Sequence, residues 1–169
     1  MEMTQTGPVH FRRIDVQEII DVTIAGVRLA IEHLNDPSRR GGYFCLVEPE
    51  GNQMALPTLV LGIGTVPAGK GPRYLALAQE KARRLAKHPE HRSSWQSRNP
   101  DKDEWGGAIV ASPYIFSFSG LSPDTADEAA MLMVAVELGY LELVKALTIA
   151  KLSANQLFKR MPVNWREPR

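Results

Sequence analysis

Two groups of short apolar segments constrain this fold more than any other feature of the sequence. In the first, residues 43–47 are followed by Glu-Pro-Glu-Gly-Asn, by a returning segment over residues 53–56 and by a third apolar stretch over residues 58–63. In the second, residues 108–111 and 114–119 are separated only by Ser-Pro. Strands joined by so few residues pair antiparallel, because a parallel crossover needs a dozen residues or more. The sequence therefore predicts an antiparallel sheet built from two hairpins.

Apolar residues at helical spacing precede, separate and follow these strands. The spacing predicts a first helix over roughly residues 15–34, with Asp15 as its N-cap. A second helix is predicted over residues 74–87, where an alanine-rich stripe would let it lie close to a sheet. The helical pattern then runs through residues 122–161, and Gly139 is a candidate break between two helices.

This order of elements indicates an α+β domain with helices packed on one face of an antiparallel sheet. We expect residues 1–13 to be a polar lead-in, residues 14–161 to form a single domain and residues 162–169 to be a tail. Within the domain, residues 142–161 form a C-terminal helical extension. A polar loop over residues 89–105 is long enough to indicate a functional or mobile segment, and its two tryptophans indicate that it packs on something.

Composition excludes several classes of protein. A chain of 169 residues with 44% hydrophobic and 23% charged residues is an ordinary globular domain. Its net charge of +1 argues against a dedicated nucleic-acid surface, and no run approaches the ~20 apolar residues that span a membrane. The N-terminus lacks the features of a secretory signal, so we expect a cytoplasmic protein. Cys45 is the single cysteine, and we expect it to be a small core residue.

Three segments carry a family resemblance. Residues 45–52 match a strand-and-hairpin motif, residues 77–86 match a helix with a Lys-Ala pair, and residues 118–123 with Asp127 and Glu128 match a Ser-Gly turn before a helix. In this order and spacing, over roughly residues 14–141, the chain resembles the GlcG/HbpS-like family, a group of heme-binding and heme-degrading proteins that includes the PduO C-terminal domain.

The chain also departs from the family pattern. Glu48 stands where the family has aspartate, Leu121 stands where it has a second glycine, and the helix over residues 142–161 has no counterpart. The resemblance implies a profilin-like or PAS-like fold, in which an antiparallel sheet is flanked by helices. It further implies homo-oligomers, and heme or a related tetrapyrrole as the ligand.

Heme would need an axial ligand, for which the sequence offers His33 and His91. His33 lies at the end of the first predicted helix, where it could equally bond a terminal carbonyl. His91 follows His88 in the sequence His-Pro-Glu-His, which suggests a metal pair, but the proline prevents the helical i, i+3 geometry that would support one, and a solvated loop is the alternative explanation.

Other candidate residues would bind an anionic group of a ligand. Lys81 could hold a propionate, although a lysine on such a helix is by default solvated. Glycines let a ligand approach the backbone in the Gly106-Gly107 pair and in the turn formed by Ser119, Gly120 and Ser122. The helix that follows this turn would also offer free N–H groups to an anion. Ordinary turn chemistry is the alternative explanation for both segments.

The leading hypothesis is a small-molecule-binding protein of the GlcG/HbpS-like type that binds heme or a similar ligand. The alternative is a non-catalytic interaction module that assembles through its C-terminal helix, whose apolar residues lie on more than one side. The glycines near residue 63 do not form a dinucleotide fingerprint, and no serine lies in a G-x-S-x-G elbow. The sequence therefore leaves open whether the protein is an enzyme.

Overall fold

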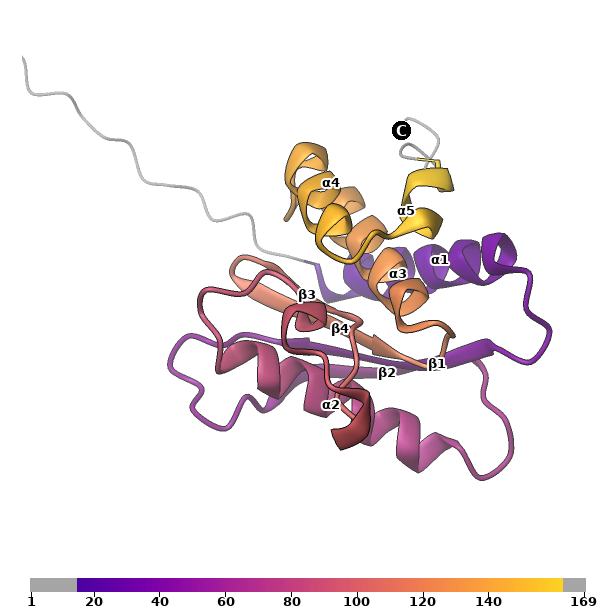
Figure 1. Ribbon diagram of the computed structural model, residues 1–169, viewed down its shortest axis with the longest axis horizontal. Coiled ribbons are helices and arrows are strands. Elements are labelled where there is room, and N and C mark those ends of the chain that lie inside the picture. Colours follow the sequence, from indigo (N-terminus) through magenta and orange to yellow (C-terminus); the bar gives the residue numbers. More distant parts are fainter. Residues whose placement is uncertain (1–14, 163–169) are drawn as a thin grey trace, which may run out of the picture.

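The computed structural model describes residues 15–162 (Figure 1). Along the chain the elements are α1 (Val16–Leu34), β1 (Arg40–Val47), β2 (Pro57–Thr65), α2 (Gly71–Ala86), the 3-10 helices η1 (Ser94–Ser97) and η2 (Pro100–Lys102), β3 (Ala108–Ala111), β4 (Tyr114–Ser119), α3 (Asp124–Glu137), α4 (Leu143–Leu152) and α5 (Gln156–Arg160). The lead-in expected over residues 1–13 lies outside the described residues, as does the expected tail beyond residue 162.

The four strands form one antiparallel sheet in the order β2-β1-β4-β3, so the fold is α+β. β1 lies at the centre, where Tyr43 pairs with Gly62 of β2 on one side and with Ser119 of β4 on the other. Most of β1 is buried, because helices cover both faces of the sheet at this strand. Cys45 is a fully buried residue of β1, as expected, and burial raises the pKa of its thiol to about 11.

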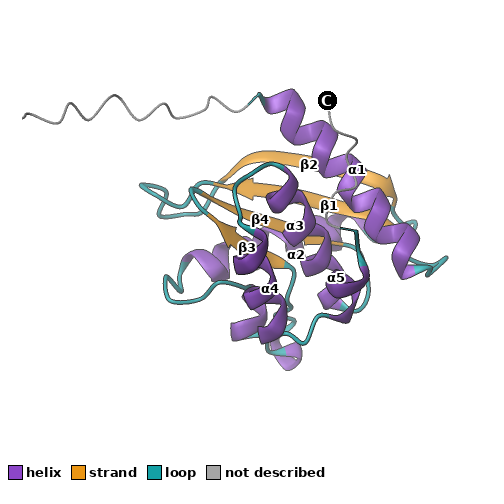
Figure 2. Cartoon of the chain, turned by 90° about the horizontal axis from the view of Figure 1, so that it is seen from above, coloured by secondary structure: helices purple, strands orange, loops and turns teal. Residues whose placement is uncertain are grey.

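Helices cover both faces of the sheet rather than one. α1 and α3 pack together on one face, with α4 and α5 beyond them, and α2 lies against the opposite face (Figures 1 and 2). The prediction that the helices share one face was wrong, because helical spacing says that a helix has an apolar side but not which face of a sheet receives it. α2 turns Ala78 and Ala82, both fully buried, toward β1 and β4, and these small side chains let the helix approach closely.

The second predicted hairpin is confirmed and the first differs. β3 and β4 pair across Ser112-Pro113 as expected. By contrast, residues 53–56 form no strand, and the return begins only at Pro57. The side chain of Asn52 accepts a hydrogen bond from Leu56 N and donates to the carbonyls of Glu48 and Leu56, so it holds the connection as a loop. Met54 and Leu56 remain exposed, so no core contact favours a strand there.

The predicted C-terminal helical stretch is divided into three helices. Gly139, at φ +82°, follows α3 and marks the expected break. A second break, which the sequence pattern did not indicate, lies between α4 and α5 and includes Ala154 at φ +50°. Asn155 then caps α5 by accepting a hydrogen bond from Phe158 N. Apolar residues keep helical spacing across this break, so the spacing alone cannot reveal it.

The core has two parts, one on each face of the sheet. The smaller lies under α2. The larger lies between the sheet and α1 and α3, and it includes buried residues from α4 and α5, namely Ala146, Ile149, Ala150, Leu157 and Phe158. Residues 142–161 therefore pack into the same core as the rest of the described chain. No helix within residues 15–162 is long and apolar enough to cross a membrane.

Candidate functional site

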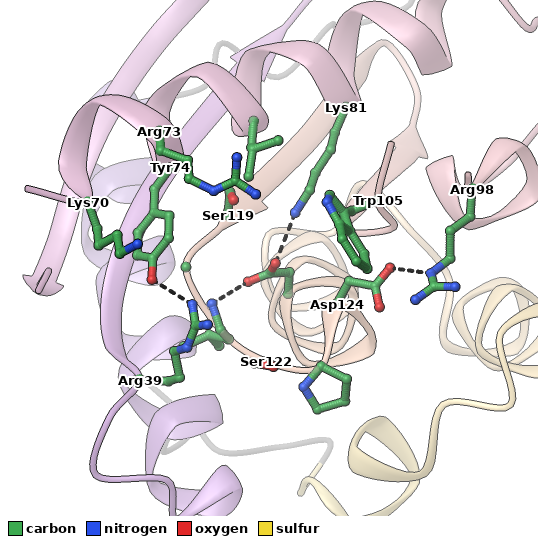
Figure 3. A pocket seen from close by; sticks show the side chains of 15 residues that line it. Arg39, Lys70, Arg73, Tyr74, Lys81, Arg98, Trp105, Ser119, Ser122 and Asp124 are labelled. Carbon is green, nitrogen blue, oxygen red and sulfur yellow. Dashed lines mark hydrogen bonds and ion pairs between the residues drawn. The ribbon is translucent and has the colours of Figure 1, made fainter. Parts of the chain in front are cut away.

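A cavity of about 290 Å³ lies beside the N-terminal half of α2, at the point where β4 leads into α3 (Figure 3). α2 and the segment before it supply Lys70, Arg73, Tyr74 and Lys81, and the connection from β4 to α3 supplies backbone and side chains over residues 119–124. Arg39, which immediately precedes β1, and two residues of the loop before β3 complete the wall. The cavity therefore gathers residues that are far apart in the sequence.

Lys81 and Asp127 form a buried ion pair at the inner wall of the cavity. Lys81 Nζ lies 2.9 Å from Asp127 Oδ2 and also donates to the carbonyl of Phe118 at 2.9 Å. The two side chains are only 2% and 3% exposed. Burial raises the pKa of Asp127 to about 6, although Lys81 and a hydrogen bond from Leu121 N oppose that shift. The solvated lysine that a helix of this composition favours by default is therefore ruled out.

Gly107 leaves the space in which this ion pair fits. Its φ of +123° is a conformation that side chains rarely adopt, and a Cβ there would lie 2.8 Å from Lys81 Nζ and from Asp127 Cβ. Gly106 helps to position a second aspartate, because its N–H donates a hydrogen bond to Asp124 Oδ2 at 2.7 Å. The Gly106-Gly107 pair thus lies behind the cavity wall and positions two carboxylates, rather than lining the cavity itself.

The loop before β3 is ordered against the cavity by two arginines. Arg98 pairs with Asp124 Oδ2 at 2.8 Å, and its guanidinium lies between the rings of Trp95 and Trp105, 4.7 and 5.1 Å from their centroids. Arg98 and Trp105 line the cavity. Stacking between two aromatic faces while bonding a carboxylate is a role that suits arginine and not lysine. The two tryptophans noted in the sequence therefore pack on an arginine of their own loop.

Arg84 fixes the same loop to α2. Its guanidinium donates to the carbonyls of Ser94 and Trp105, to Ser97 Oγ and to the carboxylate of Glu80. Five donors in one rigid fork can satisfy several acceptors at once, so one side chain holds both ends of a loop that has little regular structure. The loop is thereby kept in place as a wall of the cavity.

Three further cations lie around the cavity. Arg39 Nη1 donates to the hydroxyl of Tyr74 at 2.5 Å, and Arg73 forms two hydrogen bonds of 2.8 Å with the carboxylate of Asp103. Lys70 is the third. Within residues 15–162, neither Arg39 nor Lys70 forms an ion pair with a carboxylate. The cavity therefore carries positive charge that its own carboxylates do not neutralise.

Glu128 is a third buried carboxylate of α3, after Asp124 and Asp127, and it connects three parts of the chain. It is fully buried and accepts hydrogen bonds from Ser93 Oγ at 2.5 Å, from Ser153 Oγ and from Asn155 Nδ2 at 2.9 Å. Burial raises the pKa of Glu128, and these three neutral donors oppose the shift. Through these hydrogen bonds the carboxyl group links α3 to the start of the loop before β3 and to the break between α4 and α5. Glu128 therefore has a structural role.

The structure brings together four of the six anion-binding candidates. Lys81, Ser119, Gly120 and Ser122 all line the cavity. The first residue of α3, Asp124, also lines it, and no side chain caps the N-terminus of that helix. Sequence reasoning missed the other cations that line the cavity, Arg39, Lys70, Arg73 and Arg98. The tryptophans flanking Arg98 were the one signal that could have pointed to it, because basic residues elsewhere on the chain are equally frequent.

The two histidines proposed as axial ligands lie elsewhere. His33 is exposed near the end of α1, with Nδ1 3.0 Å from the carbonyl of Leu29, which lies one turn back in the same helix. His91 lies in the turn after α2 and does not line the cavity. Among the lining residues, Tyr74 alone belongs to the types that ligate heme iron, and its hydroxyl is bonded to Arg39. Neither histidine is therefore placed to ligate the iron of a heme bound in this cavity.

Comparison of the chain with protein-family models, with curated proteins and with solved structures found no match.

Proposed function

We propose that the protein binds a small organic anion, through a carboxylate or phosphate group, in the cavity between α2 and the β4–α3 connection. The observation that carries this proposal is the concentration of positive charge: five cationic residues line the cavity, Arg39, Lys70, Arg73, Lys81 and Arg98, against two carboxylates. The whole chain carries a net charge of only +1, so the cavity is far more basic than the average surface.

The cations divide into two groups by their partners. Lys81 and Arg98 are each held by an aspartate of α3 and define the shape of the inner wall. Arg73 is paired with Asp103, so these three cations add little net charge. Arg39 and Lys70 form no ion pair with a carboxylate within the described residues, although Arg39 lies near enough to Asp36 to help lower its pKa, and they are the groups that would attract an anion. Cations converging on a partly enclosed site raise the local concentration of an anion and bond it with charge-assisted hydrogen bonds.

The backbone supports the same chemistry. The uncapped N-terminus of α3 lies at the cavity wall, where N–H groups and the helix dipole favour a negative group. The volume of about 290 Å³ is at the lower end of the range for small-molecule sites, which favours a compact ligand. The resemblance to the GlcG/HbpS-like family points to ligand binding as well, and the propionates of a tetrapyrrole are carboxylates. Heme stays a prediction within this wider class.

Isothermal titration calorimetry with inorganic phosphate, succinate and hemin tests the proposal. We expect saturable binding of at least one of these anions, weakened by added salt and lost in the double variant Arg39→Gln/Lys70→Gln. The matched control is Lys145→Gln, which removes an exposed lysine of α4 away from the cavity and should leave binding unchanged. Equal binding by the double variant would overturn the proposal, as would the absence of binding to all three probes.

A second candidate function is self-assembly through α4, and one observation favours it. Val144, Leu147 and Leu152 are 73%, 40% and 46% exposed. At 100° per residue Val144 lies opposite the buried residues Ala146 and Ile149. Leu147 lies on one side of Val144 and Leu152 on the other, nearer the buried face. Exposed apolar residues grouped on one helix face are typical of an interface with another chain.

Deleting residues 142–161 cannot separate the two functions, because α4 and α5 supply buried core residues and the truncated chain would lose stability in either case. The double variant Val144→Lys/Leu147→Lys leaves the core intact. If the protein assembles through α4, sedimentation of the wild type shows an oligomer and that of the variant a monomer. A wild type that stays monomeric at high concentration excludes this function, and anion binding by the variant is expected to persist.

A further inference from the structure

The segment His88-Pro89-Glu90-His91, directly after α2, is a tight turn that brings two imidazoles together. His91 N–H donates to the carbonyl of His88 at 2.9 Å, which is the hydrogen bond that closes a four-residue turn. Proline suits the second position of such a turn, because its fixed φ matches the one required there. Pro89 excludes a helix, as the sequence indicated, but it favours a turn that places the side chains of positions one and four close together.

The contacts in this turn form a cluster of metal-ligand groups. The rings of His88 and His91 are stacked, with centroids 4.6 Å apart and planes 17° from parallel. Glu90 Oε1 lies 3.3 Å from His88 Nδ1 and 3.6 Å from His91 Nε2. One ligand atom from each of the three residues can be chosen so that all three lie within 4.8 Å of one another. Ligand atoms about 2 Å from a shared tetrahedral cation lie about 3.3 Å apart, so the two contacts of Glu90 are already close to this spacing, and any longer separation must close by rotation of the side chains.

We propose that His88, Glu90 and His91 form a binding site for a divalent transition-metal ion of the Zn²⁺ or Ni²⁺ class, separate from the anion cavity. Two imidazole nitrogens and one carboxylate are the donor set that such cations favour, whereas Mg²⁺ and Ca²⁺ favour oxygen ligands alone. Three protein ligands leave coordination positions for water.

The surroundings of the cluster allow a cation to enter and the ligands to adjust. The side chains of His88 and Glu90 are 40% and 66% exposed, so a hydrated ion reaches them from solvent and both can rotate toward it. His91 is 19% exposed, and its Nδ1 is buried without a hydrogen-bond partner among the described residues. Because Nδ1 is buried, Nε2, which faces Glu90 Oε1, is the nitrogen through which this ring would ligate a cation.

The test is a titration of untagged protein with ZnCl₂ and NiCl₂ by isothermal calorimetry, in the presence of excess Mg²⁺. We expect one ion per chain and a rise in the thermal unfolding midpoint when the ion is present. His88→Gln and His91→Gln should each weaken binding roughly tenfold or more, since even groups that only support a metal ligand contribute 10- to 100-fold. The matched control is His33→Gln, which removes an exposed histidine on α1 and should leave binding unchanged.

His88 is the decisive position, because its exposed side chain can be replaced without disturbing the fold. Circular dichroism of His88→Gln should match that of the wild type. Binding that persists in the double variant His88→Gln/His91→Gln would overturn the proposal. A wild type that shows neither heat of binding nor a rise in its unfolding midpoint would overturn it equally.

Discussion

Replacing Lys81 with methionine would break the buried ion pair while keeping most of the apolar stem of the side chain. The substitution removes the partner that lies 2.9 Å from Asp127 Oδ2 and leaves that carboxyl with the N–H of Leu121 as its remaining partner. It also leaves the carbonyl of Phe118 without its donor. Removing one member of a buried pair typically costs 3–5 kcal/mol, because the charge that remains is neither solvated nor compensated.

The structure also sets an upper bound on the electrostatic part of this loss. In the variant, Asp127 can escape the penalty by taking up a proton. Because the pKa of Asp127 in the folded wild type is already about 6, this costs only about 1 kcal/mol at pH 7 and almost nothing at pH 5, where the carboxyl is largely protonated before the substitution. Since the carbonyl of Phe118 also loses its donor, we expect Lys81→Met to lose roughly 3 kcal/mol at pH 7 and distinctly less at pH 5.

Urea denaturation followed by tryptophan fluorescence measures this loss. With a slope of about 2 kcal/mol per molar urea, the midpoint of Lys81→Met should fall by about 1.5 M at pH 7. Arg73→Gln is the control, because its ion pair with Asp103 is about half exposed and should contribute no more than about 1 kcal/mol. A loss in Lys81→Met as small as that of the control would refute the reasoning, and so would a loss that is the same at both pH values.

Three further predictions follow from buried groups. Gly107→Ala should lower the unfolding midpoint in a thermal melt by several degrees, because its Cβ would contact Lys81 and Asp127; an unchanged midpoint would contradict the close packing. The pKa of Glu128 is raised in the folded protein, so the stability that this group provides is present below its ordinary pKa and is lost as the pH rises through the raised pKa. The urea midpoint of Glu128→Gln should therefore rise relative to that of the wild type between about pH 4.5 and pH 7.5. A difference between the two midpoints that stays constant over this range would contradict the raised pKa. Cys45 should react with a thiol reagent only after unfolding, since its thiol is buried and its pKa is about 11; rapid reaction of the native protein would contradict its burial.

Local signals in the sequence located several elements well. Asp15 caps α1 by accepting a hydrogen bond from Gln17 N, as its position before the first apolar residues predicts. The β3–β4 hairpin and the break at Gly139 were also found, because both depend on the conformational preferences of one or two residues. The first hairpin was misplaced because Asn52 bonds the backbone on both sides of its loop, a cross-link that spacing does not encode.

The candidate site shows a similar division. The turn over residues 119–122 was proposed from its glycine and serines, and it does line the cavity. Lys81 was also proposed, but its burial was not foreseen, because the aspartate that makes burial tolerable lies 46 positions away. For His88 and His91 the sequence argument considered only a helix, which Pro89 does exclude, and did not consider the turn that stacks their rings.

By itself the sequence determined where most helices and strands lie, that the sheet is antiparallel, and that residues 119–122 form a turn leading into a helix. These properties follow from side-chain spacing and from the dihedral angles that proline and glycine permit, both of which act over a few residues. Only the tertiary structure decided which face of the sheet receives α2, which loop packs against it, and which charges meet in the cavity. Those outcomes depend on contacts between segments that are distant in the sequence. In a buried contact solvent is excluded, so a charged side chain such as Lys81 can be buried only because a partner such as Asp127 compensates its charge.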